Sequence, residues 1–299
     1  MAIRSEYIGT VAALSAGVVW GFLGLLTRMS YEAGITTFQL TCLRYLIISL
    51  VILAFIFWKD KGMFRIDLKA GLILLLMGIV GTILNSVTYL ESMKVISLSL
   101  ASVLQYIAPF CVILISAPLL KEKITLNKSI AVVTAFIGCI LCTGVISDPG
   151  SMNLWGIFLG SVSGLCFSIY VIGSKILSRD GYSISTVLFY TSVICWVGLA
   201  PFADLPAAID IMSGSVHALA LVVGMGLFVT LLPFVLFNYS LNRIEAGKAS
   251  VLTYAEPVAA TVIGLIIYQE GVSLDLVIGI VLILLALIVI SRKDVHAQA

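Results

Sequence analysis

The sequence predicts an all-α integral membrane protein whose ten transmembrane helices form two inverted five-helix repeats. Of its 299 residues, 61% are apolar and 11% are charged, and the mean hydropathy is +1.18, far above that of soluble domains. Apolar runs of helix-spanning length recur between short polar connections, whereas a β-barrel would show short alternating segments. The nonapeptide ASVLQYIAP at 101–109 returns 148 positions later as ASVLTYAEP at 249–257, with six of nine residues identical. The chain is therefore predicted to contain two copies of one module.

Each predicted span is an apolar run of about 20 residues, the length that crosses the hydrocarbon core of a bilayer. The first, Tyr7–Met29, follows a single Arg4 and is too long for the core of a signal peptide, so we expect it to remain in the mature chain. Polar connections delimit the other nine, which are Thr37–Trp58, Leu68–Leu90, Ser97–Leu120, Leu126–Val145, Leu154–Leu177, Ile184–Phe202, Val216–Leu241, Lys248–Tyr268 and Leu274–Ser291. The longest connection, around Ala203–Ser215, is too short for a globular domain.

The positive charges predict the orientation, because Lys and Arg near span ends are retained on the cytoplasmic side. Alternate connections and the two termini hold fourteen of the seventeen basic residues, namely Arg4, Lys59, Lys61, Arg65, Lys69, Lys121, Lys123, Lys128, Lys175, Arg179, Arg243, Lys248, Arg292 and Lys293. The opposite connections hold only Arg28 and Lys94, and Arg44 lies inside a span. Both termini are therefore predicted to be cytoplasmic.

The repeat boundary is predicted to divide the chain into copies at 1–147 and 148–299. A second registration, at an offset of 147, matches Gly9, Gly17 and Arg28 with Gly156, Gly164 and Lys175. Because five spans precede the second copy, that copy enters the bilayer from the opposite side, and the repeats are inverted. Paired repeats of this kind build many membrane transporters around a central site.

Several function classes find no support in the sequence. The net charge of +2 comes without a basic stripe, so no nucleic-acid partner is expected. Nucleotide-binding loops and nucleophile motifs are missing, and we expect neither an enzyme nor a cofactor. All six cysteines fall in predicted spans, where they serve as small apolar residues, and no metal is assigned.

Two kinds of motif point to a known family. The first span contains Gly17-Val18-Val19-Trp20-Gly21, and spans four and nine run from Pro109 to Glu122 and from Pro257 to Glu270. Together with ten spans in two halves, these motifs resemble the EamA-type transporters of the drug/metabolite transporter superfamily over the whole chain. The resemblance implies a central cavity lined mainly by helices one, three, four, six, eight and nine, with alternating access by the two halves. Relatives are associated with export or import of amino acids, other metabolites and drugs, so the substrate stays open.

Glu256 is the most informative single residue. It lies about eight residues into span nine, roughly 12 Å along the helix, and a charge at the bilayer centre costs on the order of 3 kcal/mol. One interpretation is contact with a substrate amine or carriage of a proton, since burial favours the protonated carboxyl and a cation favours the ionised one. The other is a hydrogen-bonded carboxyl that braces the backbone beside Pro257. The sequence does not decide between them.

Arg44 is the second charge within the membrane, about seven residues into span two. Its guanidinium suits a substrate carboxylate or an internal acidic partner. The competing interpretation is structural, because a long arginine side chain can carry its charge to the outer interface. The sequence favours the structural role.

Six further residues complete the candidate substrate-binding set. Helical spacing places Gln105 on one face of span four, and Thr253 with Glu256 on the matching face of span nine, as a cavity wall or a helix seam. Trp20 and Tyr170 are deep enough for an aromatic wall, with packing as the alternative. Asn85 and Asn238 suit a zwitterion, with capping or interhelical bonding as the alternative.

The prolines of the repeated nonapeptide, Pro109 and Pro257, are predicted to bend spans four and nine at equivalent points. Such paired bends suit helices that flex or curve around a cavity. Static kinks that only shape the bundle are the alternative.

These observations predict a secondary active transporter, an exporter by preference, of a small polar or amphipathic metabolite, with amino acids favoured. The expected partners are the substrate, the lipid bilayer and a proton as candidate coupling ion, and a monomer is favoured. The expected location is the cytoplasmic membrane of a prokaryote. An intramembrane lipid-modifying enzyme and a non-transporting membrane scaffold remain as alternatives.

Overall fold

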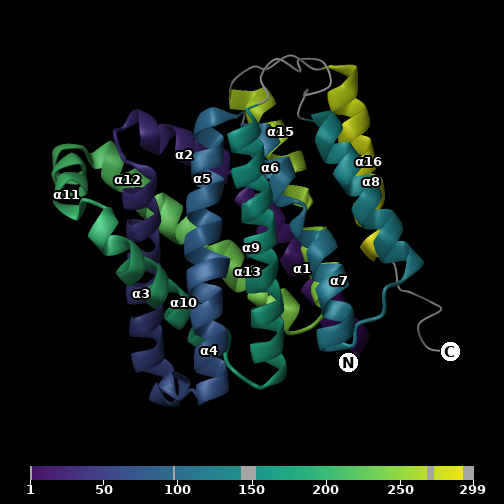
Figure 1. Cartoon of the computed structure of the whole chain (residues 1–299), viewed down its shortest axis with the longest axis horizontal. Helices are drawn as coiled ribbons and strands as arrows, with labels where there is room; N and C mark the ends of the chain where they lie inside the picture. The colour runs from purple at the N-terminus through teal and green to yellow at the C-terminus, as the bar shows by residue number, and fades with distance from the viewer. Residues whose placement is uncertain (1, 97, 143–152, 268–272, 292–299) are drawn as a thin grey trace.

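A computed structural model of the chain describes residues 2–96, 98–142, 153–267 and 273–291. Within these ranges the backbone forms helices and their connections, with no strand (Figure 1). Nine helical runs in the described chain are long and apolar enough to cross a membrane, and the predicted fifth span is the shorter α8, Leu126–Cys142. The predicted all-α membrane fold is confirmed. The expected end of the fifth span at Val145, the 147/148 boundary and Glu270 lie outside the described residues.

The nine long runs are, in chain order, α1 (Ala2–Trp20) with α2 (Leu23–Glu32); α3 (Thr37–Lys59); α4 (Leu68–Leu76), η2 (Met77–Leu84) and α5 (Asn85–Val95); α6 (Leu98–Gln105) with α7 (Ala108–Leu120); α9 (Leu154–Arg179); α10 (Ile184–Leu199) with η4 (Ala200–Phe202); α12 (Val216–Gly224), η5 (Met225–Leu231) and α13 (Leu232–Leu241); α14 (Ala246–Leu252) with α15 (Ala255–Ile267); and α16 (Leu274–Ser291). Two short helices, η1 (Lys61–Phe64) and α11 (Leu205–Gly214), lie in connections.

Short polar side chains begin several of these helices. The Thr36 hydroxyl accepts from the Gln39 amide at 3.4 Å, and the Gln39 side chain accepts from the Thr36 amide at 2.9 Å, which forms a capping box before α3. Asp67 accepts from the Ala70 amide at 2.7 Å before α4, and Ser183 does the same for Thr186 at 3.0 Å before α10. Since a helix start leaves backbone N–H groups unpaired, these caps fix where the spans begin.

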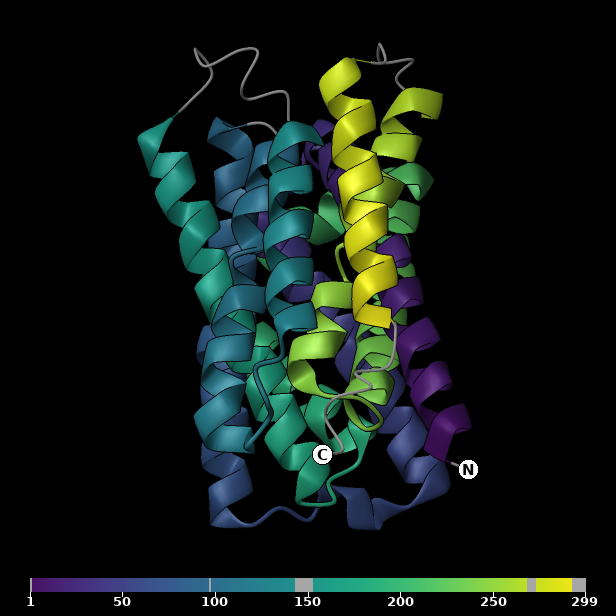
Figure 2. The same cartoon turned by 90° about the vertical axis from the view of Figure 1, so that its right-hand side faces the viewer.

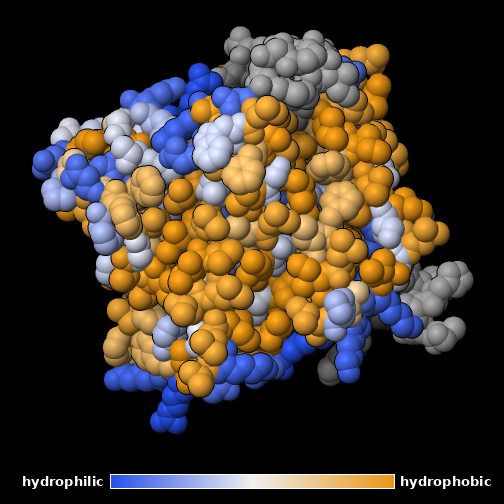
Figure 3. Space-filling model, viewed as in Figure 1, coloured by the Kyte–Doolittle hydropathy of each residue, from blue (hydrophilic) through white to orange (hydrophobic). Residues whose placement is uncertain are grey.

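The helices cross the bundle alternately, so that α1 begins and α16 ends at the same end (Figure 2). We call this the basic end, because it carries the connections 59–68, 120–126, 179–184 and 241–246, which together with the helix ends beside them hold most of the lysines and arginines of the described chain. The first helix of the second half, α9, begins at the opposite end and runs in the direction opposite to α1 (Figures 1 and 2). An apolar belt covers the middle of the molecule, with hydrophilic side chains gathered along the basic end (Figure 3).

The two halves share a helix interruption at equivalent places. α6 ends at Gln105 and α7 begins at Ala108, while α14 ends at Leu252 and α15 begins at Ala255. In each half the proline of the nonapeptide, Pro109 or Pro257, follows within the first turn of the new helix, where the missing N–H is harmless.

Among the described residues, a π-helical segment also occurs once in each half, as η2 and η5. In η2 the Thr82 hydroxyl donates to the Met77 carbonyl at 3.0 Å, and in η5 the Thr230 hydroxyl donates to the Met225 carbonyl at 2.7 Å. Both bonds reach back five residues, and the two segments are 148 positions apart. π-helical turns are rare and concentrate at functional sites, so their pairing marks these two helices for attention.

Glycines allow close approach of helices at two kinds of seam. A Cβ on Gly17 would lie 2.9 Å from the Thr253 carbonyl, and one on Gly164 would lie 2.8 Å from the Gln105 carbonyl. α1 and α9 therefore press against the interrupted helix of the other half. A second seam joins α8 to α16, where a Cβ on Gly138 would lie 2.7 Å from the Gly279 carbonyl.

Buried charges join the helix ends at the basic end. The Glu122 carboxylate, 5% exposed, accepts from the amides of Ala246 and Gly247 at 2.9 and 3.2 Å and lies 3.8 Å from Arg179. Beside it, the Lys175 ammonium donates to the carbonyls of Leu241 and Ile244, Lys128 pairs with Glu245, and Lys248 pairs with Glu6 at 2.9 Å. We call these contacts the basic-end network. Through Glu122 they tie the connection between α7 and α8 in the first half to the start of α14 in the second.

Candidate functional site

A cavity lies inside the bundle, where the interrupted helices of the two halves meet. The space between its walls, counted with its opening, is about 690 Å³. Its lining residues are Trp20, Leu23, Arg44, Tyr45, Asn85, Ser86, Tyr89, Gln105, Tyr106, Ala108, Pro109, Phe167, Val229, Thr230, Phe234, Ser250, Thr253 and Glu256. All six helices that the family resemblance implies contribute to this wall, and the second span adds Arg44 and Tyr45.

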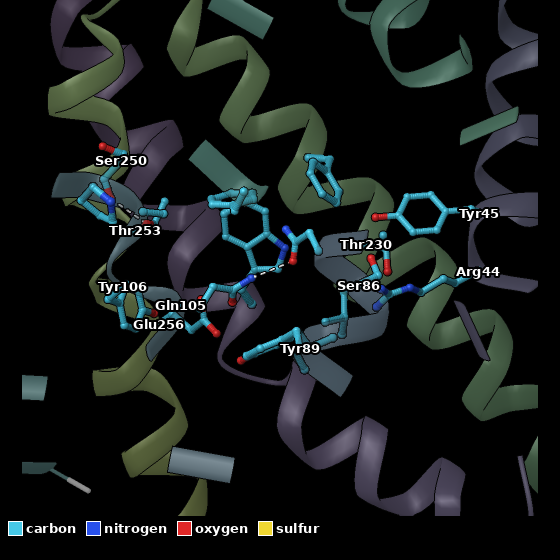
Figure 4. A pocket seen from close by; sticks show the side chains of 18 residues that line it. Arg44, Tyr45, Ser86, Tyr89, Gln105, Tyr106, Thr230, Ser250, Thr253 and Glu256 are labelled. Atoms are coloured by element: carbon cyan, nitrogen blue, oxygen red, sulfur yellow. Dashed lines mark hydrogen bonds between the residues drawn. The ribbon is translucent and has the colours of Figure 1, made fainter. Parts of the chain in front are cut away.

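Glu256 defines one end of the cavity. Its side chain is 8% exposed and lies near the rings of Tyr106 and Tyr89 (Figure 4). Because the chain is interrupted at Thr253, Glu256 lies in the first turn of α15, where unpaired N–H groups and the helix dipole favour a carboxylate. The helix interruption therefore lowers the cost that a carboxylate would have in the middle of a continuous span.

Tyr89 and Gln105 are held near this end by neighbouring polar groups. The Tyr89 hydroxyl and the Ser102 hydroxyl are 2.9 Å apart, and the Gln105 side-chain amide donates to the Asn85 side-chain oxygen at 3.1 Å. The Gln105–Asn85 bond joins α6 to α5 across the cavity (Figure 4). Both amides still have hydrogen-bonding capacity that a solute can use.

Arg44 defines the other end of the cavity. Its side chain is 5% exposed and points from α3 toward Ser86 and Thr230 (Figure 4). Its guanidinium carbon lies 5.2 Å from the centre of the Tyr45 ring. The side chain lines the cavity, and whether its role is structural or substrate-binding stays a prediction.

Aromatic rings cover the wall between the two charged ends. Trp20 packs edge-on against Phe167 and Phe234, with ring centres 6.0 and 5.5 Å apart. Tyr170 lies next to both phenylalanines, at 6.2 Å from Phe167 and 5.0 Å from Phe234. This wall suits the apolar part of a solute.

Of the ten residues that the sequence singles out, seven line the cavity and three do not. Trp20, Arg44, Asn85, Gln105, Pro109, Thr253 and Glu256 line it. Tyr170 and Asn238 lie behind the aromatic wall, where the Asn238 amide donates to the Tyr170 hydroxyl at 2.8 Å and to the Phe234 carbonyl at 2.8 Å. The Thr253 hydroxyl already donates to the Ser250 carbonyl at 2.7 Å, and Pro257 is buried in α15 outside the lining.

Several lining residues are not among the sequence candidates. Three of them are Tyr89, Ser86 and Phe167. A single polar residue in a helix does not show which face of that helix points into the bundle. Thr230 carries a signal, because MGIVGT at 77–82 recurs as MGLFVT at 225–230 with the same offset of 148 as the nonapeptide. A search for that second repeat would find it. In the described chain, no group of three or more His, Cys, Asp or Glu residues is arranged to hold a metal ion.

Comparison with known proteins assigns the chain to a family. The model of the EamA-like transporter family matches it twice, at residues 7–144 and 154–292. An uncharacterized transporter of Archaeoglobus fulgidus is 34% identical over 66% of this chain and 69% of its own length, and a second from the same organism is 28% identical over 97% and 98%. The uncharacterized inner membrane transporter YicL of Salmonella typhimurium is 26% identical over 95% of each chain.

The fold is also found among solved structures. One crystal structure superposes with a TM-score of 0.75 and covers 94% of this chain and 95% of that chain, at 20% sequence identity. This likeness shows the fold alone. The two family matches cover nearly the whole sequence, and they fall on the two halves that the inverted helices form. The protein is a multi-pass membrane transporter and belongs to the EamA-like transporter family.

Proposed function

We propose that the protein is a secondary active transporter that exports a small polar or amphipathic metabolite, with amino acids as the favoured class, across the cytoplasmic membrane of a prokaryote. The observation that carries this proposal is the cavity, which lies where the interrupted helices of both halves meet and has the Arg44 guanidinium at one end and the Glu256 carboxyl at the other. An aromatic wall connects the ends. Such a cavity suits a solute with an apolar body and charged or polar groups.

The proposed mechanism is alternating access by the two halves around this cavity. The basic-end network supports it, because Glu122 of the first half holds the amides of Ala246 and Gly247 in the second. In the proposed cycle these bonds hold the basic end closed. Opening that end would break them, and matching bonds at the opposite end would then have to form.

Glu256 is the proposed contact for the substrate amine, with a proton as the competing occupant. The Glu256 carboxylate lies in the first turn of α15 at the wall of the cavity. There it can release a proton when it binds the substrate amine, and take up a proton when the amine leaves. We propose further that the monomer suffices, because both halves of the cavity come from one chain, and that the basic end is cytoplasmic. No chemical conversion is proposed.

Counterflow in proteoliposomes tests the transport proposal. Purified protein is reconstituted with an internal pool of each amino acid or related metabolite, and uptake of labelled solute is followed. We expect saturable exchange for one chemical class, and a selective loss of it in Glu256→Gln. The matched control is Glu32→Gln, which removes an exposed carboxylate paired with Arg28 outside the cavity.

Each outcome bears on one part of the proposal. Exchange in the wild type with an unchanged rate in Glu256→Gln would remove Glu256 from the pathway and leave transport standing. Absence of exchange across the panel, from protein shown to be folded, would contradict transport of this substrate class. A reporter fused at the C-terminus would test the orientation, with cytoplasmic activity as the expected result.

A further inference from the structure

Four basic side chains in the described part of the chain are buried, and Arg44 differs from the other three in its contacts. Lys128, Lys175 and Lys248 lie in the basic-end network, where each has a carboxylate or backbone carbonyls as partners. Arg44 lies deep in the bundle, and the ion pairs found among the described residues do not include it. Its Nε atom is buried without a hydrogen-bond partner. Arg44 therefore puts a permanent positive charge at the cavity, and its Nε–H donor has no partner.

Hydroxyl side chains lie near Arg44 at this end of the cavity, and the lining places no carboxylate there. The hydroxyls of Tyr45, Ser86 and Thr230 lie around the guanidinium (Figure 4). The Thr230 hydroxyl donates its proton to the Met225 carbonyl within the π-helical segment η5, so its oxygen can act only as an acceptor here. Glu256 is the one carboxylate among the lining residues, and it lies at the far end of the cavity. A solute that enters the cavity can therefore supply a carboxylate for the guanidinium.

We propose that Arg44 forms an anion subsite of the cavity and that it binds the carboxylate of the transported solute. This inference rests on the proposed function and narrows its substrate class to small organic carboxylates. A planar guanidinium can donate to both oxygens of a carboxylate at once, whereas a halide offers only a single acceptor atom. The aromatic wall from Trp20 to Phe234 begins beside this end and receives the apolar body of the solute.

Paired ligands test the subsite by binding, without any need for transport. The probes are L-phenylalanine and L-leucine, each beside its α-amide, together with inorganic phosphate and chloride. The readout is the shift in melting temperature of the purified full-length protein as a function of ligand concentration. We expect the two carboxylates to stabilise the wild type, and the amides and inorganic anions to have a much smaller effect.

Two variants and one control locate the effect. Arg44→Gln should weaken carboxylate binding by about 10- to 100-fold, the range expected for hydrogen bonds to a charged group. Arg44→Lys should retain part of the affinity, because it keeps the charge and loses the planar fork. Arg28→Gln removes an arginine of α2 outside the cavity lining and should bind as the wild type does.

The outcomes separate this inference from the transport proposal. Carboxylate binding of wild-type strength in Arg44→Gln, equal binding of the amides, or no stabilisation by any carboxylate would each overturn the subsite. An equal effect of phosphate or chloride would assign Arg44 to an inorganic anion and would also overturn it. Binding that depends on Arg44, without flux in proteoliposomes, would instead leave the subsite standing and contradict transport.

Discussion

Tyr106 stacks on Tyr254, with ring centres 4.4 Å apart and planes 22° from parallel. The Tyr254 hydroxyl also donates to the Tyr106 carbonyl at 2.9 Å. The two residues hold the same position in the repeated nonapeptide, 148 residues apart. A residue that touches its own counterpart lies on the symmetry axis between the halves. This stack therefore marks the point about which the two halves are related, and Tyr106 also lines the cavity.

Tyr254→Phe should lower the free energy of unfolding by about 1 kcal/mol, because it removes a buried hydrogen bond and keeps the stacked ring. Denaturation of the purified protein in detergent micelles measures the change. Tyr7→Phe is the control, since Tyr7 is exposed on α1. Equal stability of Tyr254→Phe and the wild type would show that this bond does not hold the halves together.

Gly17→Ala and Gly164→Ala should each destabilise the protein by about 1–3 kcal/mol, the usual cost of overpacking. The added Cβ atoms would lie 2.9 Å from the Thr253 carbonyl and 2.8 Å from the Gln105 carbonyl, which cannot move without disturbing the helix interruptions. Gly224→Ala is the matched control, because nothing lies within 4 Å of its added Cβ. Melting temperatures check the series, and similar values for the three variants would contradict the close packing.

Glu122→Ala should open the basic end, because it removes the acceptor for the amides of Ala246 and Gly247. The measurement is labelling of a cysteine placed at Ser250, in a cysteine-free background, by an impermeant maleimide added at the basic end. We expect labelling to increase. Lys69→Ala is the control, since it breaks the exposed Lys69–Asp180 ion pair at the same end, and such pairs contribute little.

The result of the Glu122 experiment is decisive in both directions. Unchanged labelling in folded Glu122→Ala protein would exclude this carboxylate from the closure. Increased labelling in the Lys69 control as well would show that any loss of charge at the basic end has the effect.

Lys175→Met should lower the free energy of unfolding by about 1–3 kcal/mol. Its ammonium donates to the carbonyl of Leu241 at the end of α13 and to that of Ile244 just beyond it, and methionine leaves these buried acceptors unpaired. Lys94→Met removes an exposed lysine at the opposite end and should change stability far less. Chemical denaturation of both variants checks the difference, which would vanish if water replaced the ammonium.

Much of the fold could be predicted, because a spanning helix needs only length and hydropathy. Two predicted spans, Ile184–Phe202 and Val216–Leu241, have the same bounds as the observed helical runs. The helix interruptions lie close to Pro109 and Pro257, where the backbone loses a donor. The π-helical segments could not be predicted, since a single extra residue in a turn leaves no mark on hydropathy.

The candidate site was harder to predict, because helical spacing identifies a face and not its neighbour. The Asn238 amide donates to the Tyr170 hydroxyl, and both residues lie behind the aromatic wall. Their positions along the spans do not predict this placement. The side-chain direction of Arg44 depends on the space between α3, α5 and η5, so the sequence could not separate a cavity residue from one at the interface. Glu256 lies in mid-span as the sequence predicts, and the interruption also puts it in the first turn of α15, which hydropathy does not reveal.

The seam between α8 and α16 joins the last helix of one half to the last helix of the other through Gly138 and Gly279. The close contacts of both glycines are with residues of α8 and α16 themselves. Two polypeptides encoded separately, divided in the stretch of chain that links the halves, would carry matching helix faces, and we expect them to reassemble when they are inserted in the same bilayer. The single chain is then equivalent to an antiparallel pair of small membrane proteins fused end to end.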